Sequence, residues 1–299
     1  MSIRSSLPSL TRYTFGTMSL GQRISDFDRD VQVARTAMDS GVWFHTSQEY
    51  TAGGAFMVLR RAFDEAPDRV PPTIFKIRCD RPETINFDVH DALRRLGIER
   101  VDIAQLCRDA HDHRIVVDDF LERGPMYETC HHLHKQGLVG NFVFEVFPGF
   151  ADDALKAVEN ELFDACIFYY NPTQRFAPPA TWEAMRRLGT PILALRTLGN
   201  VRQPPAEAAA ALESRGKVEA AALLRRLQPI YAQSGCAGWV DFCVRFALST
   251  PNVLTTIGGT ANVKHFRQLY EAAQRFEPLP ESVMAQIHAL HDQAAQAAS

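Results

Sequence analysis

The sequence has no long hydrophobic run and little net charge, and each absence excludes a class of protein. No apolar stretch in its 299 residues approaches the roughly 18 residues that a membrane-spanning helix needs. Residues 1–11 are polar and interrupted by Pro8, so they lack the apolar middle of a secretion signal. Lys and Arg number 32 against 35 Asp and Glu, so the net charge of −3 gives no general attraction to nucleic acid or anionic lipid.

Clustered cysteines are also absent. The chain has six cysteines but no Cys-x-x-Cys pair, a usage typical of a reducing compartment. With 46% hydrophobic residues, the chain is too apolar to be disordered. We therefore expect a cytoplasmic globular protein whose partner is a small molecule, with neither nucleic acid nor membrane as a partner.

Short apolar runs alternate with longer segments of helical period. Eight runs have the composition of buried strands, at residues 11–15, 42–45, 73–77, 101–107, 139–144, 165–169, 191–195 and 253–257. Between them we expect amphipathic helices, for example over residues 27–40, 84–96 and 237–249. Eight strands separated by helices predict an α/β protein with a parallel sheet, and at this length the leading arrangement is a (β/α)8 TIM barrel.

The alternative is a doubly wound open sheet, although no Gly-x-Gly-x-x-Gly follows the first strand. We expect one domain over residues 1–299, closed by a C-terminal helix over residues 280–299. Residues 202–217 contain a Pro-Pro pair and an alanine-rich stretch, so we expect a loop or lid excursion there. The predicted outer helices carry no apolar stripe that demands an oligomer, and the sequence alone assigns no oligomeric state.

Polar and reactive side chains stand where the predicted strands end. In a barrel of this kind the active site lies at the carboxyl ends of the strands. The candidates at these ends, with one tyrosine just beyond, are His45, Tyr50, Lys76, Cys107, Glu145, Tyr169 and Arg196. Burying unpaired charged groups is costly, so their presence favours a polar active site over simple packing.

Two histidine-rich segments are candidate metal sites. His131, His132 and His134 belong to a helix expected outside the barrel, and their spacing does not place three ligands on one face. The second group follows the fourth strand and consists of Asp109, His111, Asp112 and His113. Alternating Asp and His is usual in polar loops, so we expect no metal ion.

An ordered series of motifs resembles the aldo-keto reductase family over nearly the whole chain. The motifs are Tyr-Thr-Phe-Gly-Thr-Met at 13–18, Gly-Val-Trp-Phe-His-Thr-Ser-Gln-Glu-Tyr at 41–50, Thr-Ile-Phe-Lys at 73–76, Leu-Gly-Ile-Glu-Arg-Val-Asp-Ile-Ala-Gln-Leu at 96–106, Tyr-Asn-Pro at 170–172 and Ile-Gly-Gly-Thr at 257–260. The resemblance implies a β/α barrel in which a Tyr protonates a carbonyl group while NADPH delivers a hydride. In that family an Asp and a Lys tune the Tyr, and a His holds the carbonyl oxygen.

This chain departs from the family at two of those four positions. Tyr50 and Lys76 match the family's Tyr and Lys, but His45 replaces the Asp and Cys107 replaces the His. Without the Asp, we expect the pKa of a partly buried Lys76 to fall. A thiol is also a weaker donor than an imidazole, so we expect ordinary carbonyl reduction to lose about 10²-fold or more at each change.

The positions that hold the cofactor's nicotinamide differ as well. Where the resemblance implies Ser-Asn, Gln and a stacking Tyr, this chain has Glu145-Val146, Ile167 and Leu195. The phosphate-facing positions are kept, and the resemblance assigns cofactor contacts to Gly16, Thr17, Gly259, Thr260, Lys264 and Arg267. NADP(H) could therefore bind through its phosphates, with little to orient its nicotinamide.

We interpret the chain as an aldo-keto-reductase-like enzyme with a rebuilt active site. Its expected reaction is acid-base chemistry without net redox change, such as dehydration, isomerisation or cyclisation of a small carbonyl compound. Tyr50 would be the general acid or base, with His45 and Glu145 as further proton-transfer groups and Cys107 as a fourth candidate. Lys76 would tune Tyr50 or, with a low enough pKa, form an imine with the substrate.

Substrate binding is assigned to Arg196, Tyr169 and Trp43, with Arg196 holding a carboxylate or phosphate. One alternative function is an NADPH-dependent aldehyde or ketone oxidoreductase with altered cofactor anchoring. The other is a non-catalytic binding protein on the same barrel.

Overall fold

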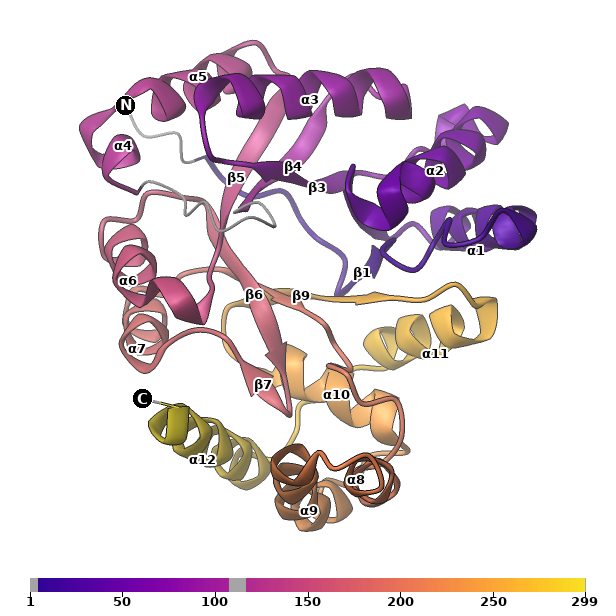
Figure 1. Ribbon diagram of the computed structural model, residues 1–299, viewed down its shortest axis with the longest axis vertical. Coiled ribbons are helices and arrows are strands. Elements are labelled where there is room, and N and C mark those ends of the chain that lie inside the picture. The colour runs from indigo at the N-terminus through magenta and orange to yellow at the C-terminus, as the bar shows by residue number, and fades with distance from the viewer. Residues whose placement is uncertain (1–4, 108–116, 299) are drawn as a thin grey trace.

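The computed structural model describes residues 5–107 and 117–298, and these form a closed barrel of parallel strands (Figure 1). The barrel strands are β1 (Tyr13–Gly16), β2 (Trp43–Ser47), β3 (Thr73–Arg78), β4 (Val101–Cys107), β5 (Val139–Glu145), β6 (Ala165–Asn171), β8 (Ile192–Leu195) and β9 (Val253–Gly259). The sheet closes because β5 pairs with both β4 and β6, while β1 pairs with both β2 and β9. All eight predicted strands are present, and the doubly wound alternative is excluded.

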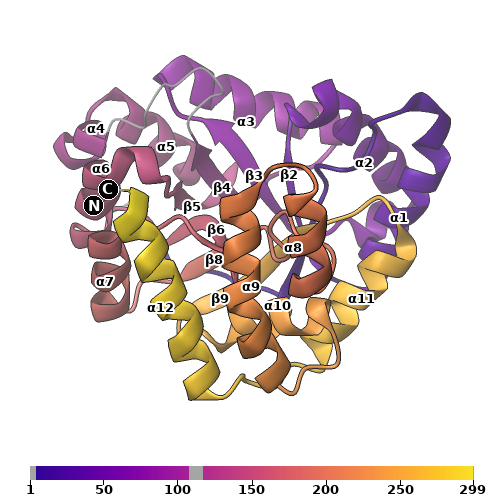
Figure 2. The same ribbon diagram turned by 60° about the horizontal axis from the view of Figure 1, so that its bottom comes forward.

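Helices surround the barrel, which lies at the centre of Figure 2. They are α1 (Phe27–Asp39), α2 (Gly54–Glu65), α3 (Pro82–Leu96), α4 (Val117–Glu122), α5 (Pro125–Lys135), α6 (Ala151–Glu159), α7 (Pro179–Leu188), α8 (Pro205–Glu213), α9 (Val218–Gln233), α10 (Trp239–Ser249), α11 (Val263–Gln274) and α12 (Glu281–Ala298). Shorter elements are the 3₁₀ turns η1 (Ile24–Asp26), η2 (Tyr50–Gly53), η3 (Pro67–Arg69) and η4 (Pro148–Phe150), and β7 (Gln174–Arg175), which is antiparallel to β6. The expected helices over 27–40, 84–96 and 237–249 correspond to α1, α3 and α10.

Side chains alternate along each strand between the helical shell and the barrel interior. Outward residues such as Phe44 and Phe75 join the large core beneath the helices. Inward residues such as Ile74, Ile103 and Val143 form a second, apolar cluster inside the barrel. Further along the strands the inward positions turn polar, so the interior changes from apolar to polar towards the carboxyl ends.

The expected loop or lid excursion over residues 202–217 includes a helix between non-helical segments. It contains α8, which begins with Pro205 in its first turn, a favoured place for proline, and continues through alanines of high helix propensity. This helix packs against α9, and α9 contacts α12 (Figure 2). The indole N–H of Trp239 donates to the carbonyl oxygen of Val201 at 2.8 Å and so fixes the entry to the excursion.

The expected C-terminal helix is α12, and it is fastened to the barrel by polar contacts. Nε2 of His291 donates to the carbonyl oxygen of Asn171 at 3.1 Å, and Arg175 pairs with Asp292 at 2.7 Å. Among the described residues, no helix has both the length and the apolar character needed to cross a membrane.

Candidate active site

A cavity of about 290 Å³ opens at the carboxyl ends of the barrel strands. The structure brings seven of the predicted site residues to its wall: Gly16, His45, Tyr50, Lys76, Tyr169, Arg196 and Gly259. Because parallel strands end at the same rim of a barrel, residues far apart in the sequence meet there. Arg202, which the sequence marked only as the start of the excursion, lines the cavity as well.

Tyr50 is carried by a strained turn. The two residues after it, Thr51 and Ala52, have φ values of 54° and 52°, in the left-handed region that β-branched residues rarely adopt. The turn is held in place because the hydroxyl of Thr51 donates to the carbonyl oxygen of Leu20 at 2.9 Å, and Gln48 donates to Asp88 at 2.5 Å. Strain of this kind persists where the surroundings fix it, often at functional sites.

Tyr50 keeps its proton at neutral pH. Burial raises the pKa of its hydroxyl well above the ordinary value, and the nearby charge of Lys76 only partly opposes this effect. A neutral phenol donates a hydrogen bond or a proton, so this geometry suits a general acid.

Lys76 has an acidic partner that comes from another strand. Its Nζ atom lies 3.5 Å from Oε1 of Glu145, which ends β5. Burial acts to lower the pKa of Lys76, but the negative charge of Glu145 raises it, and the net result lies above the ordinary value. The expectation that this pKa falls is therefore wrong, and a charged Lys76 is a poor nucleophile for imine formation.

His45 lies in the barrel interior, only 3% exposed, next to Tyr50. Its Nε2 atom is 2.7 Å from Oε1 of Gln105, and its ring centre is 6.2 Å from that of Tyr50. Burial lowers the pKa of His45 to about 4, so the ring is neutral at pH 7. Sequence reasoning missed Gln105, although period-two alternation along β4 places it on the inward face between Ile103 and Cys107.

Arg196 gives the cavity its positive side. Its guanidinium lies 4.3 Å from the ring centre of Tyr169, and its Nη1 donates to Asn200 at 3.0 Å. Its backbone is left-handed, with φ of 57°, and the side-chain amide of Asn171 donates to its carbonyl oxygen at 3.0 Å. Neither Arg196 nor Arg202 forms an ion pair with another described residue, so this side of the cavity suits a carboxylate or phosphate.

Of the predicted catalytic and substrate-binding residues, Glu145, Cys107 and Trp43 do not line the cavity, although Glu145 pairs with Lys76, which does. Cys107 is 4% exposed, and its thiol lies 3.1 Å from the carbonyl oxygen of Ile77. Burial also raises the pKa of this thiol, which removes its reactive thiolate form. Trp43 stands at the start of β2, at the amino end of the barrel, where it packs with Ile74 in the interior apolar cluster. Cys107 and Trp43 are therefore not part of the proposed site.

Three of the residues assigned to the cofactor have structural roles around the end of β1, Gly16 and Gly259 where it meets β9 and Thr17 beside β2. Gly16 and Gly259 are register partners, and a Cβ atom on Gly259 would lie 2.4 Å from the carbonyl oxygen of Gly16. This close approach requires glycine and leaves bare backbone at the cavity wall. Thr17 is buried, and its hydroxyl donates to that of Thr46 at 2.7 Å.

The other three cofactor candidates lie at the start of α11, outside the cavity. The hydroxyl of Thr260 accepts from the backbone N–H of Asn262, whose own side chain caps α11 by accepting from the N–H of Lys264 at 2.8 Å. Lys264 and Arg267 are exposed on this helix. The cap already satisfies backbone donors that a phosphate would otherwise use.

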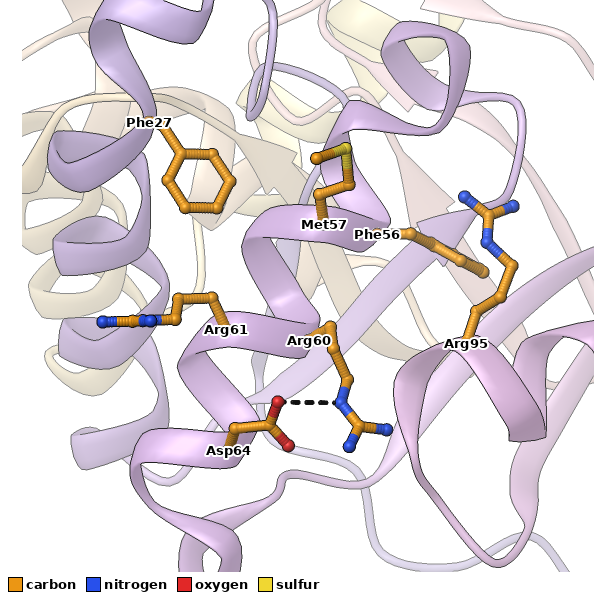
Figure 3. Close-up of a pocket in the computed structure, with 7 residues that line it drawn as sticks. All are labelled: Phe27, Phe56, Met57, Arg60, Arg61, Asp64 and Arg95. Carbon is orange, nitrogen blue, oxygen red and sulfur yellow. Dashed lines mark hydrogen bonds and ion pairs between the residues drawn. The ribbon is translucent and has the colours of Figure 1, made fainter.

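A second cavity, of about 350 Å³, lies outside the barrel between α1, α2 and α3. It is lined by Phe27, Phe56, Met57, Arg60, Arg61, Asp64 and Arg95 (Figure 3). Its charges are engaged within the wall: Arg60 pairs with Asp64 at 2.9 Å, and Arg95 lies 4.7 Å from the ring centre of Phe56. None of the predicted site residues lines this cavity.

Two of the three histidines of α5, His131 and His134, are engaged in local contacts. The ring of His131 stacks on Tyr127, and Nδ1 of His134 donates to the carbonyl oxygen of Val139 at 3.2 Å. No group of three potential metal ligands occurs within residues 5–107 and 117–298. The second cluster considered, Asp109, His111, Asp112 and His113, lies outside the described residues.

Several solved structures are similar to this chain in fold. Two aldo-keto reductase structures from Klebsiella pneumoniae, one in complex with NADPH and one with NADP and acetate, each match with a TM-score of 0.65 at 18% identity, covering 95% of this chain and 91% and 92% of theirs. The glycerol dehydrogenase of Gluconobacter oxydans matches with a TM-score of 0.73 at 17% identity, covering 95% of this chain and 93% of that one. No curated protein sequence matches the chain. The model of the aldo/keto reductase family matches residues 12–292, and the chain therefore belongs to that family.

Proposed function

We propose that this protein catalyses acid-base chemistry without net redox change on a small carbonyl compound that carries a carboxylate or phosphate. The observation that carries the proposal is the ion pair of Lys76 and Glu145 beside Tyr50. Glu145 stands where the family resemblance implies a contact to nicotinamide, and here it serves Lys76 instead. Proton-transfer groups thus occupy the barrel mouth.

The residues around the mouth fit the nicotinamide half of NADP(H) poorly. Val146 and Ile167, at positions where the resemblance implies amide-binding side chains, are 1% and 0% exposed and apolar. Leu195 lines the cavity but offers no aromatic ring for stacking. A bound nicotinamide would therefore lack both its hydrogen bonds and its stacking partner, and the proposed reaction does not require it.

The reaction proceeds by paired proton transfers. Tyr50 donates its proton to the carbonyl oxygen while a base removes a proton from the adjacent carbon, which gives an enol. When the adjacent carbon carries a hydroxyl group, the enol is an enediol: protonation of the former carbonyl carbon and transfer of the second hydroxyl's proton to the Tyr50 phenolate then give the isomer, with no gain or loss of electrons. The charge of Lys76 stabilises the phenolate that forms on Tyr50, and Arg196 holds the substrate's anionic group.

Incorporation of solvent deuterium tests this function directly. Small 2-oxo acids, 2-hydroxy acids and phosphate esters of hydroxyketones are incubated with the protein in D₂O and followed by NMR. We expect deuterium at the carbon next to the carbonyl group of at least one compound, with the rate falling 10²-fold or more in Tyr50→Phe. Tyr270→Phe, on the outer helix α11, is the matched control and keeps the rate. Equal rates in wild type and Tyr50→Phe would contradict the proposal.

A second candidate is an NADP(H)-dependent carbonyl reductase. It is favoured by Arg196 and Arg202 at the cavity wall, which suit phosphate groups, and by the NADPH and NADP present in the Klebsiella structures. Calorimetric titration with NADPH and NADP⁺ separates the two candidates. Micromolar binding that is lost in Arg196→Ala, or in Lys264→Ala/Arg267→Ala, would support the reductase. No binding at millimolar cofactor would exclude it.

A further inference from the structure

Gln105 is a buried polar residue that the reaction described above does not use. Its side chain is 0% exposed, and its Oε1 atom lies 2.7 Å from Nε2 of His45. Its own Nε2 atom is buried and has no hydrogen-bond partner among the described residues. An amide in the barrel interior with half of its hydrogen bonds unmade is costly, so packing alone does not account for it.

The barrel places Gln105 and His45 within reach of each other. They come from β4 and β2, with β3 between them, and inward side chains of alternate strands share layers in this fold. The register puts Gln105 level with Lys76 on β3, and Lys76 level with Ser47 on β2. The side chain of Gln105 thus extends past β3 to His45. Because both side chains are buried, their contact is held in place.

The contact decides which nitrogen of His45 carries the proton. A carbonyl oxygen only accepts hydrogen bonds, so Nε2 of His45 must be the donor to Gln105. A neutral imidazole has one N–H, which leaves a lone pair on Nδ1. No hydrogen bond between described residues engages this Nδ1. The charged Lys76 nearby further disfavours a second proton on the ring, and Tyr50, the other titratable neighbour, is neutral.

We propose that Gln105 is a positioning residue that holds His45 in the tautomer whose Nδ1 accepts the proton removed from the substrate. The proposal rests on the acid-base function above and names the base that it requires. Tyr50 then acts as the acid and His45 as the base, while Glu145 remains paired with Lys76. The proton leaves the substrate carbon for Nδ1 as Tyr50 protonates the carbonyl oxygen. Nδ1 then gives its proton to the former carbonyl carbon, while the Tyr50 phenolate takes the proton of the second hydroxyl group.

Long-range ¹H–¹⁵N correlation spectra of the wild-type protein with ¹⁵N-labelled histidine report the tautomer without any substrate. The chain supplies two internal references. His291 bonds a carbonyl oxygen through Nε2, at 3.1 Å, and His134 bonds one through Nδ1, at 3.2 Å. At pH 7 we expect the His45 signals, assigned through their loss in His45→Gln, to show the pattern of His291. A pattern like that of His134, or an average of both, would overturn the proposal, because it would mean that the amide of Gln105 is turned the other way or does not fix the ring.

Substitution of Gln105 tests its role. In Gln105→Met, which keeps length and loses the acceptor, we expect a mixture of tautomers and about fivefold slower deuterium incorporation, the factor that one hydrogen bond represents. In Gln105→Glu the carboxylate keeps the Nε2–H tautomer and raises the pKa of His45. Unchanged His45 signals in Gln105→Met would refute the positioning role. If Gln105→Met fails to fold, the wild-type spectrum still determines whether His45 carries its proton on Nε2, as the proposal requires. If no compound exchanges, the function fails while the tautomer result stands.

Discussion

At the scale of single residues, the acidic partner of Lys76 comes from an unexpected place. The family resemblance puts this partner on β2, where His45 stands, whereas the structure supplies Glu145 from β5 at 3.5 Å. Moving the carboxylate across the barrel keeps Lys76 charged and frees the β2 position for a neutral imidazole. The presence of His45 on β2 and the presence of Glu145 on β5 are therefore explained by one change, the transfer of the acidic partner of Lys76 from β2 to β5.

Removing the charge of Glu145 tests this pairing. The side chains of Lys76 and Glu145 are 23% and 13% exposed, so Glu145→Gln leaves a mostly buried ammonium without its partner. We expect the free energy of unfolding, measured by urea denaturation, to fall by about 2 kcal/mol, and the pKa of Lys76 to fall as well. Lys76→Met/Glu145→Gln removes both charges and recovers most of the loss. If the double variant is no more stable than Glu145→Gln, the pair is not coupled.

His45 predicts how stability depends on pH. Its pKa is about 4 in the folded protein, against about 6.5 for an unfolded histidine, so the unfolded chain binds a proton first as pH falls. Stability is complete above pH 6.5, and about 3 kcal/mol is lost between pH 6.5 and 4. His291, whose pKa burial lowers to about 3, adds a similar loss over an overlapping range. Urea denaturation of wild type and His45→Gln at several pH values isolates the contribution of His45. If the free energy of unfolding depends on pH identically in the two proteins, this contribution is disproved.

At the scale of elements, the sequence predicted the strands well because apolar β-branched and aromatic runs mark buried strands regardless of tertiary context. The residues predicted at their carboxyl ends include Tyr50, Lys76 and Arg196, which line one cavity, and Glu145, which pairs with Lys76. The contact of His45 with Gln105 could not be read in the same way, because it depends on which inward side chains share a layer in the closed barrel. Trp43 was assigned to the substrate although it begins its strand, at the end of the barrel away from the cavity.

The junction of β1 and β9 makes a prediction at this scale. A methyl group on Gly259 would lie 2.4 Å from the backbone oxygen of Gly16, whereas one on Gly16 would have its nearest contact at 3.4 Å. We expect Gly259→Ala to lower the free energy of unfolding by about 2–3 kcal/mol, since backbone on both strands must shift. Gly16→Ala should cost less than about 1 kcal/mol. Thermal and urea denaturation of the two variants check the difference; equal losses would contradict the close approach.

At the scale of the whole molecule, the fold is shared with solved aldo-keto reductases, while we propose that the mouth of the barrel is rebuilt. The structural matches extend over 95% of the chain, so the scaffold is retained. The positions where the family resemblance implies other residues include His45 on β2, Cys107 and Glu145 at the ends of β4 and β5, and Leu195 at the end of β8. A stable barrel tolerates such exchanges because its packing lies in the two apolar clusters below the rim and beneath the helices.

One measurement compares the rates of proton transfer and of hydride transfer in a single sample. The protein, one carbonyl compound of the panel and stoichiometric NADPH are mixed in D₂O, and deuterium incorporation is followed by NMR while NADPH is followed by its absorbance. We expect deuterium to enter the substrate at a rate that depends on Tyr50, while the NADPH absorbance stays constant. Consumption of NADPH in proportion to alcohol formed, with no deuterium exchange in its absence, would contradict the redox-neutral site and identify the protein as a reductase.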